Sequence, residues 1–277
     1  DRPAPDLVIR LGPVQHILEQ AQAKEGESIY QISAGSLLLK IDKVARYLVS
    51  GGREIIVEPD LAAAEKDVRL FLLGSAMGAL LYQRGVWPLH GSAIACGDGA
   101  ALFVGARGSG KSSLAGEFHR RGFEVLADDI CAINAGNDGT FQVWPGIPNI
   151  KLWADSVVKL GGDPSQLTRT SSAHDKYDIP VQQFGRDPMA VQAVYALYMS
   201  DSQGEVILKP LKGFDKIQEL TANTYRLPFL AGMQLAPQHF EQVQALARQA
   251  RVVRVTRPLQ LFLLSELADM IERDIAQ

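Results

Sequence analysis

Residues 105–112 of the sequence have the composition of a phosphate-binding loop. They read Gly-Ala-Arg-Gly-Ser-Gly-Lys-Ser and satisfy the pattern G-x-x-x-x-G-K-[ST] without a mismatch. In such a loop the backbone N–H groups converge on phosphate oxygens, the lysine reaches the β- and γ-phosphates, and the serine hydroxyl can bind Mg²⁺. Nucleotide phosphates are therefore expected to be bound by Gly105, Ala106, Arg107, Gly108, Ser109, Gly110, Lys111, Ser112 and Ser113.

The alternative to phosphate binding is a glycine-rich loop that matches the pattern by chance. Average residue usage produces the pattern in about one chain in a hundred of this length, before the flanking elements are considered. Within the loop, Arg107 has two interpretations, because it can add positive charge toward phosphate or simply be exposed. The pattern and its position favour binding of a nucleoside triphosphate.

A pair of adjacent carboxylates, Asp128 and Asp129, follows the apolar stretch 123–127. Neighbouring residues at a strand end point in different directions, so one carboxylate can hold Mg²⁺ while the other accepts a proton from an attacking hydroxyl. An acidic turn with an N-capping role is the alternative. Together, the loop and the pair predict phosphoryl transfer from ATP with Mg²⁺ as the metal.

His90 is the third candidate for a role in this chemistry. A single histidine is usually structural, but antiparallel pairing of residues 92–96 with 100–104 would return His90 to the sheet end where the loop begins. We therefore expect His90 to lie near the transferred phosphate. The other four histidines have no metal-ligand spacing, and no Ser-His-Asp or Cys-His arrangement is visible.

The elements that position these residues are readable from the apolar pattern. Strands at 92–96 and 100–104 flank Gly97-Asp98-Gly99, a helix from Lys111 to about Arg121 follows the loop, and Gly122 can cap it. Such a strand, loop and helix arrangement is typical of a phosphate site. Later segments predict hairpins of 130–134 with 140–144 and of 191–199 with 205–211, then a helix at 237–250, a strand at 252–256 and a helix at about 259–275.

Residues 7–57 contain short β-type runs separated by turn residues, which predict a small antiparallel sheet. The apolar spacing then becomes helical through residue 83. We therefore expect a small β-rich N-terminal domain at 1–65, followed by an α/β domain with a mixed sheet at 66–277.

The composition narrows the functional classes. The chain has 277 residues and a net charge of −3, which gives no basic surface for nucleic acid. The apolar stretch at 70–82 is too short for the roughly 20 residues of a membrane-spanning helix, and the sequence begins without the layout of a secretory signal. Cys96 and Cys131 lie in apolar runs that predict buried free thiols, so we expect a cytoplasmic location.

The residues at 84–131 resemble the catalytic domain of HPr kinase/phosphorylase, a P-loop kinase with the HPr kinase/PEP carboxykinase-like fold. The resemblance rests on His90-Gly91, on the loop, and on Ala127-Asp128-Asp129 after Arg121-Gly122. Within that superfamily the fuller set of matching stretches is similar to the HPr-kinase-like proteins encoded beside lasso-peptide genes, which phosphorylate a serine hydroxyl at the C-terminus of a precursor peptide. The match is firm over 84–131 and looser from there to about residue 258. The stretches similar to those proteins are Arg84-Gly85, Pro88 to Ala93, Pro145-Gly146, Lys151-Leu152-Trp153, Lys176-Tyr177 and Asn223-Thr224-Tyr225-Arg226.

The resemblance implies a role for each matching residue. Asp129 would be the general base and Asp128 the metal-side carboxylate beside Ser112, although the reverse assignment is nearly as good. His90 would orient the reacting phosphate or the acidic pair, and Lys111 would stabilise developing charge. Lys151 and Lys176 would meet the acceptor, or would be solvated loop charges.

Two departures from the family narrow the expected activity. The stretch 143–146 reads Val-Trp-Pro-Gly and lacks the family's metal-binding Glu and its Arg, and no later basic loop matches. We therefore expect a kinase without phosphorylase activity, and an acceptor other than HPr. The alternatives are a small-molecule hydroxyl kinase and an ATP-sensing regulatory protein, and the sequence leaves the oligomeric state open, with a homo-oligomer possible.

Overall fold

The computed structural model of the chain describes residues 6–18, 22–24, 28–33, 35–201, 205–259 and 264–276. The chain forms two compact units, each assembled from several segments. Unit 1 contains Asp1–Trp87, Arg169–His174 and Arg226–Phe240. Unit 2 contains Pro88–Thr168, Asp175–Tyr225 and Glu241–Gln277. All the residues singled out for phosphate chemistry belong to unit 2.

Unit 1 is built on a six-stranded sheet of order β1-β6-β5-β4-β3-β2. The pairings are antiparallel as predicted, except that β1 runs parallel to β6. Its strands and helices are β1 (Val8–Leu11), β2 (Gln22–Lys24), β3 (Ser28–Ser33), β4 (Ser36–Ile41), β5 (Ala45–Ser50), β6 (Glu54–Pro59), α1 (Glu65–Phe71), the π-helical turn η1 (Leu72–Ala76), α2 (Met77–Gln83) and α6 (Pro228–Gly232).

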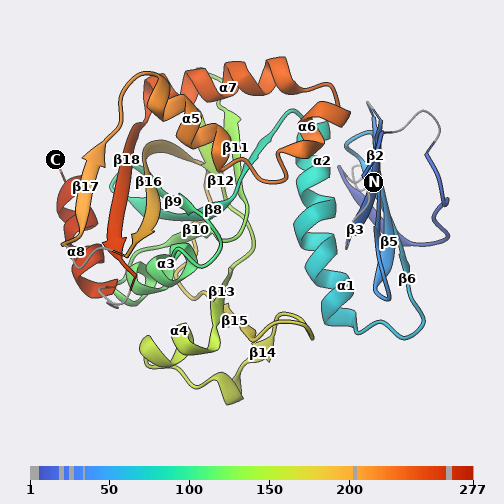
Figure 1. Cartoon of the computed structure of the whole chain (residues 1–277), viewed down its shortest axis with the longest axis horizontal. Coiled ribbons are helices and arrows are strands. Elements are labelled where there is room, and N and C mark those ends of the chain that lie inside the picture. The colour runs from blue at the N-terminus through green and yellow to red at the C-terminus, as the bar shows by residue number, and fades with distance from the viewer. Residues whose placement is uncertain are drawn as a thin grey trace, which may run out of the picture. The chain divides into compact units, whose positions relative to one another are not determined.

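Helices α1 and α2 lie along one face of this sheet (Figure 1). Burial alternates along β5, and its inward residues Tyr47 and Val49 share a core with Ala76, Ala79 and Leu80. Small residues on α2 let the helix approach the sheet closely. The compact units therefore divide the chain elsewhere than the boundary predicted after residue 65, because these helices complete the core of unit 1.

Unit 2 is a mixed α/β structure around a sheet of order β10-β8-β9-β16-β12-β11-β7, with β18 also paired to β16 and β17 to β18. A separate three-stranded sheet has the order β13-β15-β14. The elements that make up or enter this unit are β7 (Trp87–Leu89), β8 (Gly91–Cys96), β9 (Gly99–Gly105), α3 (Lys111–Arg120), β10 (Val125–Ala127), β11 (Cys131–Ala135), β12 (Phe141–Trp144), β13 (Asn149–Trp153), α4 (Ala154–Lys159), η2 (Pro164–Gln166), β14 (Thr168–Arg169), β15 (Lys176–Pro180), β16 (Met189–Ser200), β17 (Ile207–Pro210), α5 (Phe214–Ala222), α7 (Ala236–Gln249), β18 (Arg251–Pro258) and α8 (Leu264–Ile275).

The strand directions bring several chain segments to one edge of the main sheet. Strand β16 runs parallel to both β9 and β18. Strand β8 is antiparallel to both β9 and β10, so β9 and β10 also point the same way. The carboxyl ends of β9, β10, β16 and β18 therefore meet at the edge where β8 begins. In open α/β sheets this edge is where ligands bind.

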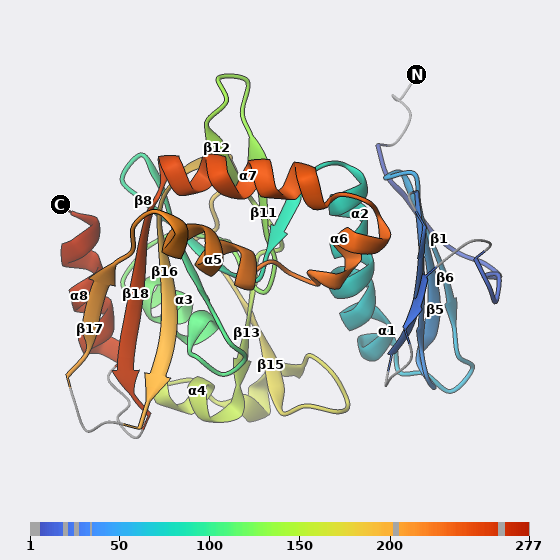
Figure 2. The same cartoon turned by 45° about the horizontal axis from the view of Figure 1, so that its top comes forward.

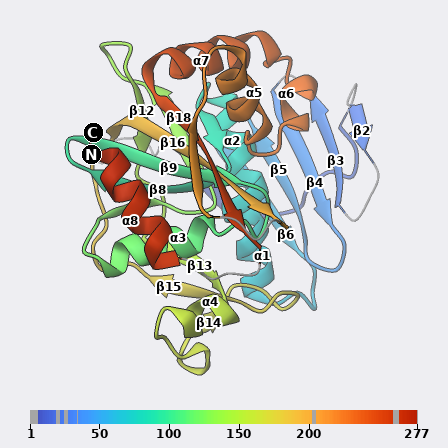
Figure 3. The same ribbon diagram turned by 60° about the vertical axis from the view of Figure 1, so that its left-hand side comes forward.

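Helices α3 and α8 lie side by side on one face of the main sheet (Figure 3). The sheet contributes Phe103, whose ring stacks on Phe118 of α3 with centroids 5.4 Å apart. Leu114 from α3 and Leu267 from α8 are buried in the same cluster. This core fixes the strand and the helix on either side of the phosphate loop.

The structure confirms two of the predicted hairpins and overturns a third. Strand β8 pairs with β9, and β11 pairs with β12. Strand β17, in contrast, pairs with β18 instead of β16, and β18 lies between them (Figure 2). The reason is that β18 is apolar on both faces, with Val252, Val253 and Val255 buried, and such a strand is most stable inside a sheet.

Two further predictions concern the thiols and the membrane. Cys96 and Cys131 are buried and free, as expected. None of the helices in the described ranges combines the length and the apolar character that crossing a membrane requires.

Candidate functional site

The predicted phosphate loop connects the end of β9 to the start of α3. Gly105 has φ +137°, and a Cβ there would lie 2.5 Å from the carbonyl oxygen of Leu197 in β16. Gly110 has φ +106° and is the residue before the first turn of α3. Both positions favour glycine because φ is positive there. At Gly105 a side chain would also meet the neighbouring strand. The glycines thus aim the N-terminus of α3 at the edge described above.

Lys111 extends back over the loop from the first position of α3. Its ammonium donates to the carbonyl oxygens of Gly105 at 2.8 Å and Ala106 at 3.0 Å. The residue is 8% exposed, and burial lowers its pKa despite the opposing charges of Asp128 and Asp129. The ammonium is therefore held between the loop and the acidic pair.

Asp128 is hydrogen-bonded on both of its carboxylate oxygens. Oδ1 accepts from the Ser92 hydroxyl at 2.6 Å, and Oδ2 accepts from the backbone N–H of Lys151 at 2.8 Å. The Ser112 side chain is also near enough to lower the pKa of Asp128. Burial raises the pKa of Asp128 even though these hydrogen bonds lower it. Ser112 of the loop and Asp128 of the pair thus lie together, as the sequence predicted for a metal site.

Asp129 has a different environment. Its Oδ2 accepts from Lys151 Nζ at 3.0 Å, and its Oδ1 lies 3.7 Å from His90 Nδ1. Burial raises the pKa of Asp129, but the charges of Lys151 and His90 outweigh it and hold the pKa below the ordinary value. The backbone at Asp129 is left-handed, with φ +73°, an uncommon conformation for a non-glycine residue that often marks functional sites.

His90 fixes the backbone of the same aspartate. Its Nδ1 is 2.9 Å from the carbonyl oxygen of Asp129, and because a carbonyl only accepts, Nδ1 carries the hydrogen. Burial lowers the pKa of His90, and the positive charge of Lys111 lowers it further. The prediction that β8 returns His90 to the loop end of the sheet is confirmed by the register, which pairs Gly91 with Val104.

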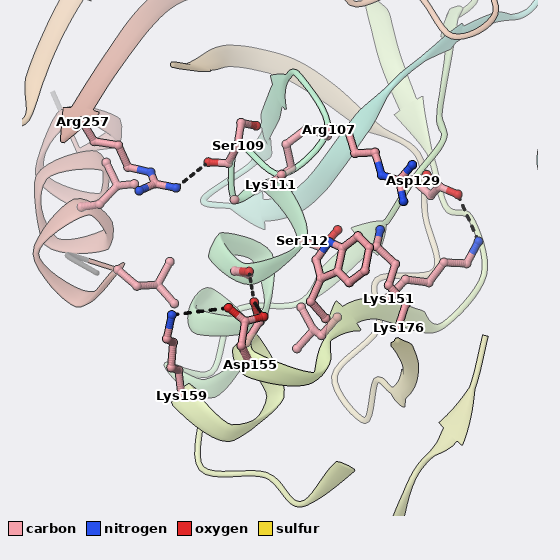
Figure 4. A pocket seen from close by; sticks show the side chains of 18 of the residues that line it. Arg107, Ser109, Lys111, Ser112, Asp129, Lys151, Asp155, Lys159, Lys176 and Arg257 are labelled. Carbon is pink, nitrogen blue, oxygen red and sulfur yellow. Dashed lines mark hydrogen bonds and ion pairs between the residues drawn. The ribbon is translucent and has the colours of Figure 1, made fainter. Parts of the chain in front are cut away.

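A cavity of about 260 Å³ lies beside the phosphate loop, His90 and Asp129. Arg107, Asp129, Lys151 and Lys176 gather at one end of it, whereas Asp155, Lys159 and Arg257 lie at the other (Figure 4). At the first end the ring of Trp153 has the Arg107 guanidinium 5.4 Å and the Lys176 ammonium 5.3 Å from its centroid. The phosphate loop lies between the two ends.

The structure brings most of the predicted site residues to this cavity. Those that line it are His90, Arg107, Gly108, Ser109, Gly110, Lys111, Ser112, Ser113, Asp129, Lys151 and Lys176. Gly105, Ala106 and Asp128 do not line it, and Asp128 is instead held by Ser92 and Lys151.

Sequence reasoning missed several lining residues. Trp153 lies in the stretch Lys151-Leu152-Trp153, but the sequence predicted no role for it. It is two residues after Lys151 in β13, so both side chains lie on one side of the strand. Asp155 and Lys159 follow in α4, where charged residues on a short helix give no signal. Arg257 lies 148 residues from its loop partner Ser109, so no local pattern could have indicated it.

The comparisons with known proteins find likenesses among solved structures. No family model matches the chain, and none of the curated proteins matches it. Among solved structures the chain is similar to the HPr(Ser) kinase/phosphatase from Coxiella burnetii, with 11% identity and a TM-score of 0.35 over 68% of this chain and 93% of that one.

Proposed function

We propose that unit 2 is an ATP- and Mg²⁺-dependent kinase that transfers the γ-phosphoryl group to a hydroxyl. The observation that carries the proposal is the meeting of a G-x-x-x-x-G-K-S loop with two carboxylates whose pKa values shift in opposite directions. Adjacent acids in unequal environments can take different roles in one reaction. A loop that only bound ATP would not need a second carboxylate, that of Asp129, beside the metal-side carboxylate of Asp128.

The donor side of the proposed reaction uses the loop and its neighbours. The N–H groups of the loop and the ammonium of Lys111 would hold the phosphates and stabilise charge on the oxygens of the transferred group. Moving Lys111 to the phosphates requires it to exchange the carbonyl oxygens of Gly105 and Ala106 for phosphate oxygens. Phosphate is the stronger acceptor for an ammonium, so this exchange is favourable.

Ser112 and Asp128 would hold the metal. Mg²⁺ prefers oxygen ligands and is usually bound by one or two protein groups together with phosphates and water, and a hydroxyl beside a carboxylate fits that preference. The described residues contain no cluster of three or more His, Cys, Asp and Glu, so no competing all-protein metal cage is found there. When bound, the metal would neutralise charge on the triphosphate.

Asp129 would act on the acceptor. It lines the cavity, is ionised at neutral pH because Lys151 lowers its pKa, and has its backbone held by His90. In this position it would accept a hydrogen bond from the acceptor hydroxyl and take its proton as the phosphoryl group transfers. The role of His90 is to position Asp129 through the 2.9 Å contact with its carbonyl oxygen.

The acceptor we propose is a serine-type hydroxyl, with the C-terminal serine of a precursor peptide as the narrower candidate. The support is the positive charge of Arg107 and Lys176 beside Asp129, which would suit an acceptor that carries a carboxylate near its hydroxyl. A C-terminal serine has both groups. A small hydroxy acid has them too, and it is the second candidate that the same charges favour.

Phosphate transfer to matched peptides tests the proposal. The protein is incubated with Mg-ATP and peptides that end in serine or in alanine, and added phosphate is detected by mass spectrometry. We expect phosphorylation of the serine peptide alone, with transfer reduced at least about a hundredfold in Lys111→Ala and Asp129→Asn. Unchanged transfer in Asp129→Asn would remove the assignment of the base, and ATP binding without transfer to any peptide or hydroxy acid would indicate a regulator.

A further inference from the structure

Arg257 is a cation beside the phosphate loop that has no carboxylate within ion-pair distance in the described part of the chain. Strand β18 carries three arginines at intervals of three residues. Arg251 pairs with Asp274 at 2.6 Å, and Arg254 pairs with Glu219 at 3.0 Å. Arg257 donates instead to two backbone carbonyl oxygens, those of Ser109 at 3.2 Å and Pro258 at 3.4 Å.

The environment of Arg257 makes this lack of a counter-charge costly. The residue is partly buried, and burial lowers the pKa of its guanidinium. A partly desolvated cation without an anion is unfavourable, and the fold retains it at the loop rather than at the surface. An anionic ligand in the cavity would supply the missing charge.

The anion that fits is a polyphosphate. The Nη2 atom of Arg257 bonds to Ser109 inside the loop and lies 3.6 Å from where a Cβ of Gly110 would be. The guanidinium is therefore beside the backbone that the sequence pattern assigns to phosphate. Arginine has a planar fork of N–H donors, so one donor can stay on the Ser109 carbonyl while others bind phosphate oxygens.

The place of Arg257 in the cavity indicates which phosphates it would contact. The acceptor would react at Asp129, and Arg257 lies at the opposite end of the cavity (Figure 4). Asp155 of α4 lies at the same end (Figure 4), and Leu264 of α8 lines a neighbouring pocket together with Lys159. The cavity lining also includes Leu267, so apolar side chains and a carboxylate are available for a base and for ribose hydroxyls. Arg257 would thus contact the phosphates that stay with the nucleoside.

We infer that Arg257 binds the nontransferred phosphates of the donor nucleotide and supplies binding energy without acting on the transferred group. The inference rests on the proposed function. Arg257 and Lys111 would then differ in their kinetic effects. A contact made equally in the ground state and the transition state, as proposed for Arg257, changes KM and leaves kcat nearly unchanged.

Calorimetric titration of the whole chain with Mg-ADP, Mg-ATP and inorganic tripolyphosphate tests the inference. Arg257→Gln is expected to weaken the binding of all three ligands about tenfold or more, since it removes a charge-assisted hydrogen bond. Arg257→Lys is expected to recover part of the lost affinity. Arg251→Gln is the matched control, because it makes the same change on the same strand outside the cavity. Circular dichroism and the thermal midpoint establish that each variant is folded.

Three outcomes would overturn the inference. Equal affinities of Arg257→Gln and the wild type for all three ligands would show that the guanidinium does not bind phosphate. A kcat reduced more than tenfold at an unchanged KM for ATP would place Arg257 on the transferred group instead. Failure of the wild type to bind any of the ligands would refute the proposed function, and this inference with it, and is thereby distinct from the other two.

Discussion

Lys151 donates from Nζ to Oδ2 of Asp129 at 3.0 Å, and the same residue donates from its backbone N–H to Asp128. One residue of β13 therefore contacts both members of the acidic pair, but its ammonium hydrogen-bonds to Asp129 and not to Asp128. This contact explains why the pKa of Asp129 is lowered while burial raises the pKa of Asp128. The two aspartates differ because of their neighbours and not because of their position in the sequence.

Lys151→Met is expected to move the acid limb of the pH profile of kcat/KM to higher pH. Removing the ammonium raises the pKa of Asp129, and because the ionised carboxylate is the active base, activity is lost at a pH where the wild type retains it. The measurement is kcat/KM for phosphate transfer from pH 4 to 8.

Lys209→Met is the control for this experiment, since Lys209 is exposed on β17 and its loss also removes one positive charge. An acid limb that stays in place in Lys151→Met would mean that Asp129 is not the group whose ionisation limits the reaction.

Gly105→Ala is expected to weaken nucleotide binding and to reduce the stability of the protein. An added Cβ would meet the carbonyl oxygen of Leu197 at 2.5 Å, in a backbone conformation that side chains rarely adopt. We expect a loss of about 2 kcal/mol or more in the free energy of unfolding and at least a tenfold loss of ATP affinity. Denaturant unfolding and ATP titration measure the two effects.

The turn glycine Gly97 provides the matched variant. It also has positive φ, but a Cβ there would meet nothing within 4 Å, so Gly97→Ala is expected to cost only about 1 kcal/mol and to leave ATP affinity unchanged. Wild-type ATP affinity in Gly105→Ala would show that the loop does not need its contact with β16.

ATP binding is expected to change the fluorescence of Trp153. The Arg107 guanidinium of the phosphate loop and the Lys176 ammonium of β15 lie 5.4 Å and 5.3 Å from the centroid of the indole, and phosphate would draw either cation away from the ring. The change should disappear in Trp153→Phe and persist in Trp144→Phe, because Trp144 does not line the cavity. A signal that survives in Trp153→Phe would come from another tryptophan and would contradict the assignment of the change to Trp153.

The sequence predicted those parts of the site that depend on short-range pattern. The loop, the acidic pair and the return of His90 all follow from one hairpin, one turn and one strand, so their geometry is decided within about 40 residues. The position of β18 was not predictable in this way, because a strand far along the chain separates β16 from β17. Arg257 reaches the loop only through that long-range pairing, and for this reason it was missed.

The packing of α1 and α2 was missed for a related reason. A helical apolar pattern shows that a helix has a buried face but does not identify what covers it. The small residues Ala76 and Ala79 become informative only when Tyr47 and Val49 are known to face them. The extent of unit 1 therefore depends on contacts between elements that are separated in sequence.

Unit 1 is expected to lose stability as the pH falls from about 6.5 to 4. His239 is 6% exposed, its ring contacts Trp87 edge to face at 5.4 Å, and burial lowers its pKa to about 4. Between this value and the ordinary 6.5 the unfolded chain binds a proton that the folded chain does not. Acidification through that window therefore lowers the free energy of unfolding, by up to about 3 kcal/mol.

Comparison with His239→Gln isolates this contribution from the rest of the chain. Glutamine has no proton to take up in the window, so the variant is expected to show a shallower decline of the free energy of unfolding between pH 6.5 and 4, whatever its stability at pH 7. His16→Gln is the control, because it makes the same substitution at an exposed histidine. Parallel curves for the wild type and His239→Gln would show that His239 is protonated in the folded protein, contrary to the effect of its burial.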